Sequence, residues 1–206
     1  MSAVARAQRQ DPVASRGADD SYYVFLDRDG TLIRHIPYLC DPTRVELLPT
    51  VVEGLEQLVR ARCTLLLHTN QSGIGRGYFS QAQALACNEA MLNQIGFGPT
   101  LFSDVCLCPE APDQQITYRK PSPRYAREVM QRHAVDASHL CYIGDNVSDL
   151  LTARNVGCNG VGVDTGGHNL RRVLPEQELH QFPVYDNFLD AVRHVLGEWW
   201  RSRGKA

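Results

Sequence analysis

Short apolar runs alternate along the chain with segments whose apolar positions recur at helical spacing. Apolar runs without polar alternation are typical of strands buried on both faces of a parallel sheet. We expect strands at Tyr22–Leu26, Thr64–His68, Asp104–Leu107, Leu140–Ile143 and Gly160–Val163. We expect helices at Val51–Ala61, Gln81–Ile95, Pro123–His133, Ser148–Asn155 and Phe188–Arg201. This alternation predicts an α/β fold, a doubly wound Rossmann-like parallel sheet.

The chain has 206 residues, a length that suits one hydrophobic core. Residues 1–20 contain little that could be buried, so we expect a disordered tail there and a single domain over residues 21–206. The proline-interrupted stretches 33–49 and 97–118 are too short to fold as a separate cap.

Composition excludes several classes of partner. The formal net charge of −2 provides no basic field for nucleic acid or an anionic membrane. No apolar run approaches the roughly 20 residues that span a bilayer. The seven cysteines show no framework of a secreted domain. We therefore expect reduced thiols in a cytoplasmic protein that binds neither nucleic acid nor a membrane.

The first predicted strand ends in two carboxylates, Asp27 and Asp29, which Gly30 and Thr31 follow. Two like charges a few ångströms apart repel by about 4 kcal/mol at a protein-surface dielectric. Such a pair persists when a cation lies between the carboxylates or when one stays protonated. Alone, the pattern could be a turn. A calcium loop is excluded because neither a third oxygen ligand nor a closing Glu follows.

Polar groups of particular kinds follow three further strands. They are Thr69, Asn70 and Gln71 after the second strand, Arg119 and Lys120 after the third, and Asp145 and Asp149 after the fourth. Each set alone could be an ordinary loop, a surface charge pair or a helix cap. Because parallel strands end at one edge of a sheet, together they indicate magnesium-assisted phosphoryl transfer to a carboxylate.

A glycine-rich run at Gly73, Gly75 and Gly77 follows the second strand. It is a weak signal for a dinucleotide site, because such a site follows the first strand and opens a helix. A loop that approaches the ligand closely fits better, and it places Arg76 where an anion could be met.

The motifs, in order, resemble those of the haloacid dehalogenase superfamily of phosphohydrolases: Asp27-x-Asp29-Gly30-Thr31, Thr69, Lys120 and Gly144-Asp145-x-x-x-Asp149. Residues 25–32, 69–79 and 119–121 look like those of the D-glycero-D-manno-heptose 1,7-bisphosphate phosphatases. The related histidinol-phosphate phosphatases share much of this pattern. The resemblance implies a capless enzyme that acts on a small sugar phosphate, and we expect a monomer.

The resemblance also implies roles for individual residues. Asp27 would be the nucleophile, Asp29 the general acid and base, and Mg²⁺ would bind Asp27, the backbone carbonyl of Asp29, and Asp145. Contacts to phosphate or substrate would come from Arg28, Thr69, Asn70, Gln71, Arg76, Arg119 and Lys120, with Arg76 and Arg119 toward the distal part of the substrate. Supporting positions are Gly30, Thr31, Asn146 and Asp149. Asn146 departs from the pattern, because a basic residue often stands there.

Many members of this subgroup carry a zinc loop, with Cys-x-His early and Cys-x-Cys late. Here Glu110 follows Cys108 where the His is expected, and Ile116 and Tyr118 replace the late cysteines. A closed tetrahedral site needs four ligands. Cys106 and Cys108 supply two, with no His nearby in sequence, so we predict no structural zinc.

Three alternatives stay open at this point. The substrate could be histidinol phosphate, which the related phosphatases hydrolyse. A receiver-like signalling module also combines acids, a Thr and a Lys at a sheet edge, but its acceptor Asp lies on a middle strand of the sequence rather than the first. An inactive relative that serves as a scaffold is a third reading, which the intact motifs disfavour.

Overall fold

A computed structural model describes residues 5–6 and 21–203. Most of the predicted tail, residues 1–4 and 7–20, lies outside the described residues, and the prediction of disorder there stays untested. Residues 5–6 form a two-residue strand, which was not predicted.

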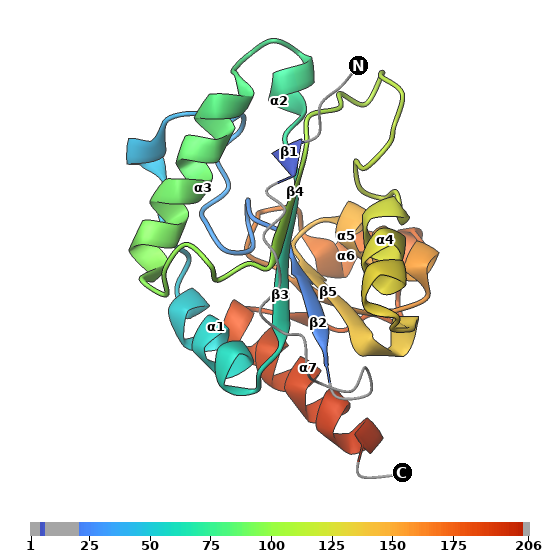
Figure 1. The fold of residues 1–206 in the computed structure, drawn as a ribbon. Helices are drawn as coiled ribbons and strands as arrows, with labels where there is room; N and C mark the ends of the chain where they lie inside the picture. The colour runs from blue at the N-terminus through green and yellow to red at the C-terminus, as the bar shows by residue number, and fades with distance from the viewer. Residues whose placement is uncertain (1–4, 7–20, 204–206) are drawn as a thin grey trace.

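The centre of the molecule is a seven-stranded sheet in the order β1-β4-β3-β2-β5-β6-β7 (Figure 1). Only β1 is antiparallel to its neighbour, so six strands form the predicted parallel sheet. The strands are β1 Ala5–Arg6, β2 Tyr23–Leu26, β3 Thr64–Asn70, β4 Asp104–Cys108, β5 Leu140–Gly144, β6 Asn159–Val163 and β7 Val184–Tyr185.

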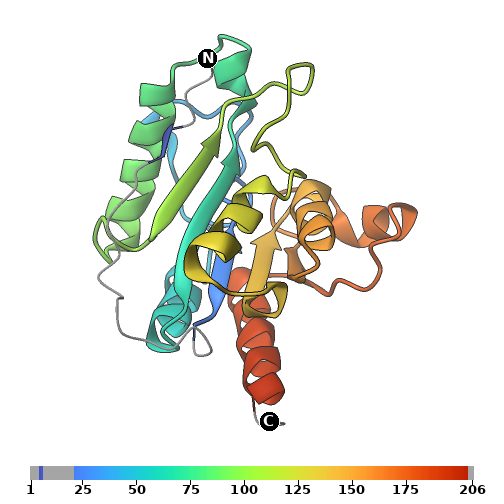
Figure 2. The same ribbon diagram turned by 45° about the vertical axis from the view of Figure 1, so that its right-hand side comes forward.

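Helices cover both faces of this sheet, as Figures 1 and 2 show. They are α1 Val51–Arg60, α2 Ser72–Gly75, α3 Gln81–Ile95, α4 Arg124–His133, α5 Val147–Val156, α6 Leu170–Glu176 and α7 Phe188–Arg203, with 3₁₀ turns at Pro42–Arg44 and Ala137–His139. All five predicted strands and all five predicted helices are present, with ends shifted by at most two residues. Among the described residues, no helix combines the length and apolar character needed to cross a bilayer.

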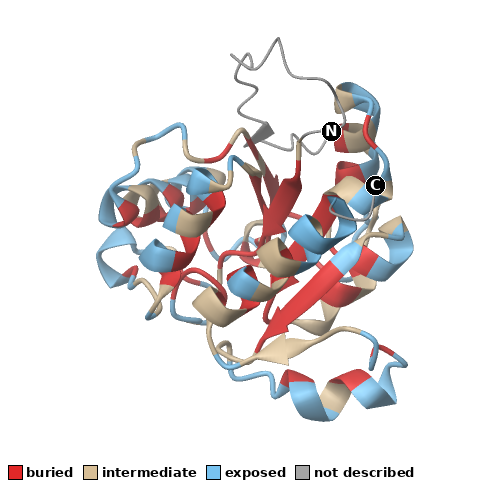
Figure 3. Cartoon of the chain, turned by 90° about the horizontal axis from the view of Figure 1, so that it is seen from below, coloured by how far each residue is buried: buried red, intermediate tan, exposed pale blue. Residues whose placement is uncertain are grey.

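Both faces of β2 are buried, which explains its unbroken apolar run. Val24 and Leu26 pack against the layer of α1, α3 and α7, while Tyr23 and Phe25 pack against the layer of α4 and α5. The ring of Phe25 stacks on Tyr142 of β5 with centroids 4.6 Å apart. Figure 3 shows the buried strands enclosed by helices whose outer faces are exposed. Each such side chain contributes roughly 1.5–3 kcal/mol through burial.

The direction of chain progression reverses beside β2. From β2 the chain builds β3 and β4 on one side, then returns to place β5, β6 and β7 on the other. In open α/β sheets the ligand-binding crevice forms at this switch point, beyond the carboxyl ends of the strands. The fold therefore places the residue after Leu26 at the centre of that crevice.

Candidate active site

Asp27 is held at the mouth of β2 by its backbone and by one cation. Its N–H donates to the carbonyl of Ile143 at 3.0 Å, and its Oδ1 lies 2.6 Å from Nζ of Lys120. The same ammonium also forms an ion pair with Asp149. Burial lowers the pKa of Lys120, but Asp149 and Asp27 outweigh that effect and raise it above its usual value. Lys120 therefore stays charged.

Three carboxylates surround this single ammonium. Oxygens of Asp27, Asp145 and Asp149 lie within 4.8 Å of one another. Burial, and then the charges of Asp27 and Asp149, raise the pKa of Asp145 well above its usual value. Burial raises the pKa of Asp149 to about 6, although Lys120 opposes the shift. The cluster carries more negative charge than Lys120 balances, which favours a bound cation.

The site fits a small oxygen-binding cation on two observations. Oδ2 of Asp145 is buried and accepts no hydrogen bond from any described residue. A Cβ at Gly30 would lie 2.3 Å from that oxygen, and one at Gly166 would lie 1.6 Å from it. Any side chain at either position would therefore clash with the Asp145 carboxylate. Oδ1 of Asp145 accepts from the Thr31 hydroxyl at 3.3 Å. These oxygens suit Mg²⁺, which prefers carboxylates and carbonyls.

Replacing Gly30 by Ala should lower kcat/KM for phosphate release roughly 10- to 100-fold, the usual cost of disturbing the surroundings of metal ligands. The added Cβ would meet the Asp145 carboxylate. The left-handed φ of +86° should in addition cost about 1–2 kcal/mol of stability. Gly96→Ala is the matched control, since Gly96 has φ +79° and open space around it. Equal activity of the two variants would contradict the proposed role of Gly30.

Asp29 has its own set of partners. Its Oδ2 lies 2.8 Å from Nη2 of Arg28 and accepts from Nε2 of Gln71 at 2.7 Å. The Thr69 hydroxyl is 3.5 Å from the same oxygen and accepts from Gln71 at 2.9 Å. Thr69 is fully buried. In this structure Thr69 and Gln71 therefore hold Asp29, and Thr69 does not line the pocket described below.

The position of Arg28 differs from the prediction that it contacts substrate. Its side chain is fully buried, and Nη1 donates to Oδ1 of Asn88 on α3 at 2.8 Å. Its other hydrogen bonds go to Asp29 and to the carbonyl of Ala84, and Arg28 does not line the pocket. The physical reason is charge balance. Arg28 neutralises Asp29 from the side of α3, whereas Lys120 neutralises Asp27 from the side of the cavity.

Two local motifs fix the loops that carry Lys120 and Asp149. The Asn70 amide accepts from the Lys120 N–H at 2.9 Å and donates to the Lys120 carbonyl at 3.2 Å. Asn146 caps α5 by accepting from the Ser148 N–H at 3.0 Å, while Asp149 accepts from the Asn146 N–H at 3.1 Å. This capping box aims Asp149 at Lys120.

A cavity of 240 Å³ opens over the acids. It is lined by Asp27, Asp29, His35, Asn70, Ser72, Arg119, Lys120, Asp145, Asn146, Ser148, Asp149 and His168. A second cavity of 300 Å³ shares Asp29, His35, Asn70 and Ser72 with it and also includes Gln71. The two cavities adjoin and together offer room for a substrate larger than one phosphate.

Two histidines at the pocket were missed from the sequence. The rings of His35 and His168 are 5.2 Å apart, and Nε2 of His168 lies 3.5 Å from Oδ2 of Asp145. Both lie in loops without a motif that would have singled them out. Arg76, by contrast, is exposed and lines neither cavity. Its charge nevertheless acts on Arg119, whose pKa is lowered by burial and further by Arg76.

Comparison with known sequences shows the family of the chain. The sequence model of the HAD-hydrolase-like family matches residues 117–191. The chain is 32% identical to D-glycero-beta-D-manno-heptose-1,7-bisphosphate 7-phosphatase of Pseudomonas aeruginosa, over 84% of this chain and 96% of that protein. The histidine biosynthesis bifunctional protein HisB of Legionella pneumophila is 30% identical, over 66% of this chain and 39% of that protein.

A solved structure extends the likeness to the fold. The crystal structure of D,D-heptose 1,7-bisphosphate phosphatase from B. bronchiseptica, complexed with magnesium and phosphate, superposes with a TM-score of 0.77 at 29% identity. The match covers 86% of this chain and 99% of that one. The fold is that of HAD-type phosphatases, and the chain is a phosphoric monoester hydrolase of this class. Within this class, the chain belongs to the family of heptose 1,7-bisphosphate phosphatases.

Proposed function

We propose that this enzyme hydrolyses one phosphate monoester of a sugar bisphosphate, D-glycero-D-manno-heptose 1,7-bisphosphate, to give the heptose 1-phosphate. The observation that carries the proposal is the Asp27–Lys120 ion pair, whose two residues line a cavity together with further acids. The proposed substrate is the one named for a relative that is 32% identical to this chain. The cytoplasmic location and the monomeric state remain predictions.

In the first step, a carboxylate oxygen of Asp27 attacks phosphorus, the bond to the leaving sugar oxygen breaks, and an aspartyl-phosphate forms. Lys120 balances the charge of the nucleophile and of the incoming phosphate, because its ammonium is already paired with Asp27. Asp27, the Asp29 carbonyl and Asp145 would hold Mg²⁺, which supplies electrostatic stabilisation of the negative charge on the transferring group. Asn70 lines the cavity beside Lys120, where it can contact a phosphate oxygen.

Asp29 is placed for the proton transfers. It borders both cavities, so a protonated Asp29 can donate to the leaving oxygen of the sugar. The resulting carboxylate then removes a proton from water, which attacks the aspartyl-phosphate, releases inorganic phosphate and restores Asp27. Arg28 and Gln71 orient the carboxylate between these steps.

A substrate panel tests the proposal. Phosphate release should be measured with the α and β anomers of the heptose bisphosphate, heptose 1-phosphate, histidinol phosphate and common hexose phosphates, with and without Mg²⁺. We expect the highest kcat/KM for a heptose bisphosphate and no turnover without Mg²⁺. A higher kcat/KM for histidinol phosphate would overturn the assignment of the sugar while leaving the reaction class in place.

Arg119 lines the cavity and offers its guanidinium to the distal part of the substrate. Arg119→Gln should raise KM for the heptose bisphosphate roughly 10- to 100-fold, the range expected for losing a charge-assisted contact to a phosphate. KM for p-nitrophenyl phosphate, which has no second phosphate, should change little. Arg76→Gln is the matched control, because Arg76 lies outside both cavities. An equal rise in KM for Arg76→Gln would show that the glycine-rich loop, which carries Arg76, contacts the distal phosphate.

A further inference from the structure

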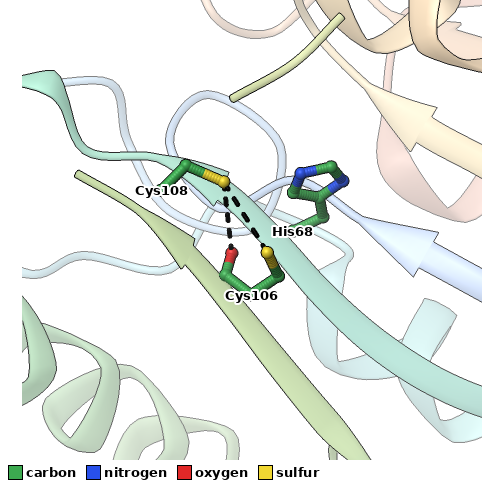
Figure 4. Close-up of side chains that lie close together, drawn as sticks. All are labelled: His68, Cys106 and Cys108. Carbon is green, nitrogen blue, oxygen red and sulfur yellow. Dashed lines mark hydrogen bonds between the residues drawn. The ribbon is translucent and has the colours of Figure 1, made fainter. Parts of the chain in front are cut away.

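A histidine in the core connects the sheet to the loop that carries Lys120. His68 on β3 pairs in register with Cys106 on β4, and its ring lies close to the thiols of Cys106 and Cys108 (Figure 4). The side chain of His68 is fully buried. A buried polar ring is costly unless its nitrogens have hydrogen-bond partners, so the partners show what the ring holds in place.

The partners of His68 fix the direction of both hydrogen bonds. Nε2 lies 3.0 Å from the backbone carbonyl of Tyr118, and since a carbonyl only accepts, Nε2 carries the proton. Burial, and then the charge of Lys120, lower the pKa of His68 to about 3, so the ring is neutral and Nδ1 has a lone pair. The Tyr142 hydroxyl therefore donates to Nδ1, at 3.1 Å. Both ring nitrogens are engaged, and neither is left for the thiols.

The two hydrogen bonds form a bridge, Tyr142–His68–Tyr118, that crosses the centre of the sheet. Tyr142 lies on β5 and His68 on β3, with β2 between them. The Tyr142 ring stacks on Phe25 of β2 with centroids 4.6 Å apart, so the bridge passes over the strand that leads to Asp27. The bridge therefore ties together the strands that end at the acidic site.

The far end of the bridge lies two residues before Lys120. The amide of Asn70 already holds the backbone of Lys120, and the Tyr118 carbonyl is a second fixed point on the same loop. The Lys120 ammonium is buried and must reach both Asp27, at 2.6 Å, and Asp149. A shift of this loop would move the ammonium relative to the oxygen that attacks phosphorus.

We propose that His68 is a positioning residue for the phosphoryl transfer, which sets the place of the Lys120 ammonium against Asp27 by holding the Tyr118 carbonyl. The inference rests on the proposed function, in which Lys120 balances the charge of the nucleophile and the transferring phosphate. Without the ring N–H, the Tyr118 carbonyl loses this donor, and the loop shifts to find another. A misplacement of about 1 Å in an active site can cost about 100-fold in rate.

Two amide variants separate this role from a general effect on packing. His68→Asn places an amide oxygen where Nδ1 accepts from Tyr142, but its N–H is too short to reach the Tyr118 carbonyl. His68→Gln is the matched control, because its longer side chain brings an N–H within reach of that carbonyl. His68→Asn should lower kcat roughly 10- to 100-fold, for p-nitrophenyl phosphate and the heptose bisphosphate alike, with a much smaller change in KM. His68→Gln should retain most of the wild-type kcat.

Leu65→Ala is the control for lost stability, because Leu65 is buried on the same strand but packs in the layer on the other face of the sheet. Its kcat should equal that of wild type at a temperature where both proteins are folded. If His68→Asn does not fold, His68→Leu removes the same N–H without adding a polar group and takes its place. An equal loss of kcat in the disrupting variant and in His68→Gln would overturn the proposal.

Hydrogen exchange gives a readout that does not depend on turnover. Peptides that cover residues 117–122 should exchange at least about tenfold faster in His68→Asn than in wild type, relative to peptides of α1, and His68→Gln should keep the slow exchange. Unchanged exchange or unchanged kcat in the folded disrupting variant would overturn the proposal. If wild-type protein releases no phosphate from either substrate, the proposed function fails, and the exchange rates still decide whether His68 holds the loop.

Discussion

Asp27→Asn should lower kcat for phosphate release by at least about 10⁴-fold, the scale of losses when a covalent nucleophile is removed. An amide oxygen does not attack phosphorus as a carboxylate does, and no neighbour can take over. Asp145 and Asp149 lie beside Asp27, but Asp145 borders the glycines and Asp149 is held by Lys120 and the α5 cap. Steady-state phosphate release with Mg²⁺ present measures the effect.

The variant should remain folded, which separates loss of chemistry from loss of structure. Asparagine removes one of three clustered carboxylates and leaves Lys120 paired with Asp149. The free energy of unfolding in urea should therefore stay the same or rise. Asp113→Asn, on the exposed loop after β4, is the control for an Asp-to-Asn change away from the site. Normal turnover by folded Asp27→Asn protein would show that another group accepts the phosphate.

Much of the fold could be predicted because the signals for strands and long helices lie in residues that are close together in the sequence. Tyr23–Leu26 is buried on both faces, so its short, unbroken apolar run is what identifies the strand. The missed helices and strands are short: β1 and β7 have two residues each, α2 has four, and α6 has seven with Pro175 inside it. Segments of this length gain little stability from their own sequence. They form because of contacts with neighbouring elements, which exist only in the folded chain.

The same limit applies to the site. The acids and Lys120 were identified because they follow strands that end at one edge. From the sequence we expect a cation between Asp27 and Asp29 or one protonated carboxyl, whereas in the structure each carboxylate has its own cation, Lys120 or Arg28. Such pairings, like the approach of His68 to Cys106, depend on the relative positions of strands and helices distant in sequence, which spacing along the chain does not encode.

Lys120→Met should lower the free energy of unfolding by about 3–5 kcal/mol at pH 8 without added Mg²⁺, the cost of removing one partner from a buried ion pair. Lys120 is buried and is paired with both Asp27 and Asp149, so methionine fills similar space but leaves two charges unbalanced. Arg124→Met is the matched control, because solvent screens the exposed Arg124–Glu128 pair at 2.9 Å, so its loss should change stability little. Urea unfolding of both variants gives the comparison.

The pH dependence identifies the cause of that loss. With Lys120 present, burial already raises the pKa of Asp149 to about 6, and Lys120 is the largest influence that opposes this rise. Removing it must raise the pKa further, so the folded variant favours protonated Asp149 and loses stability relative to wild type as pH rises from about 6 toward that higher pKa. The stability gap to wild type should therefore be largest at alkaline pH, shrink as pH falls toward 6, and stay level below it. Lys120→Met/Asp149→Asn should recover part of the loss at pH 8. A difference in the free energy of unfolding that is independent of pH and unchanged in the double variant would instead be caused by lost packing. It would contradict the conclusion that Lys120 holds Asp27 through its charge.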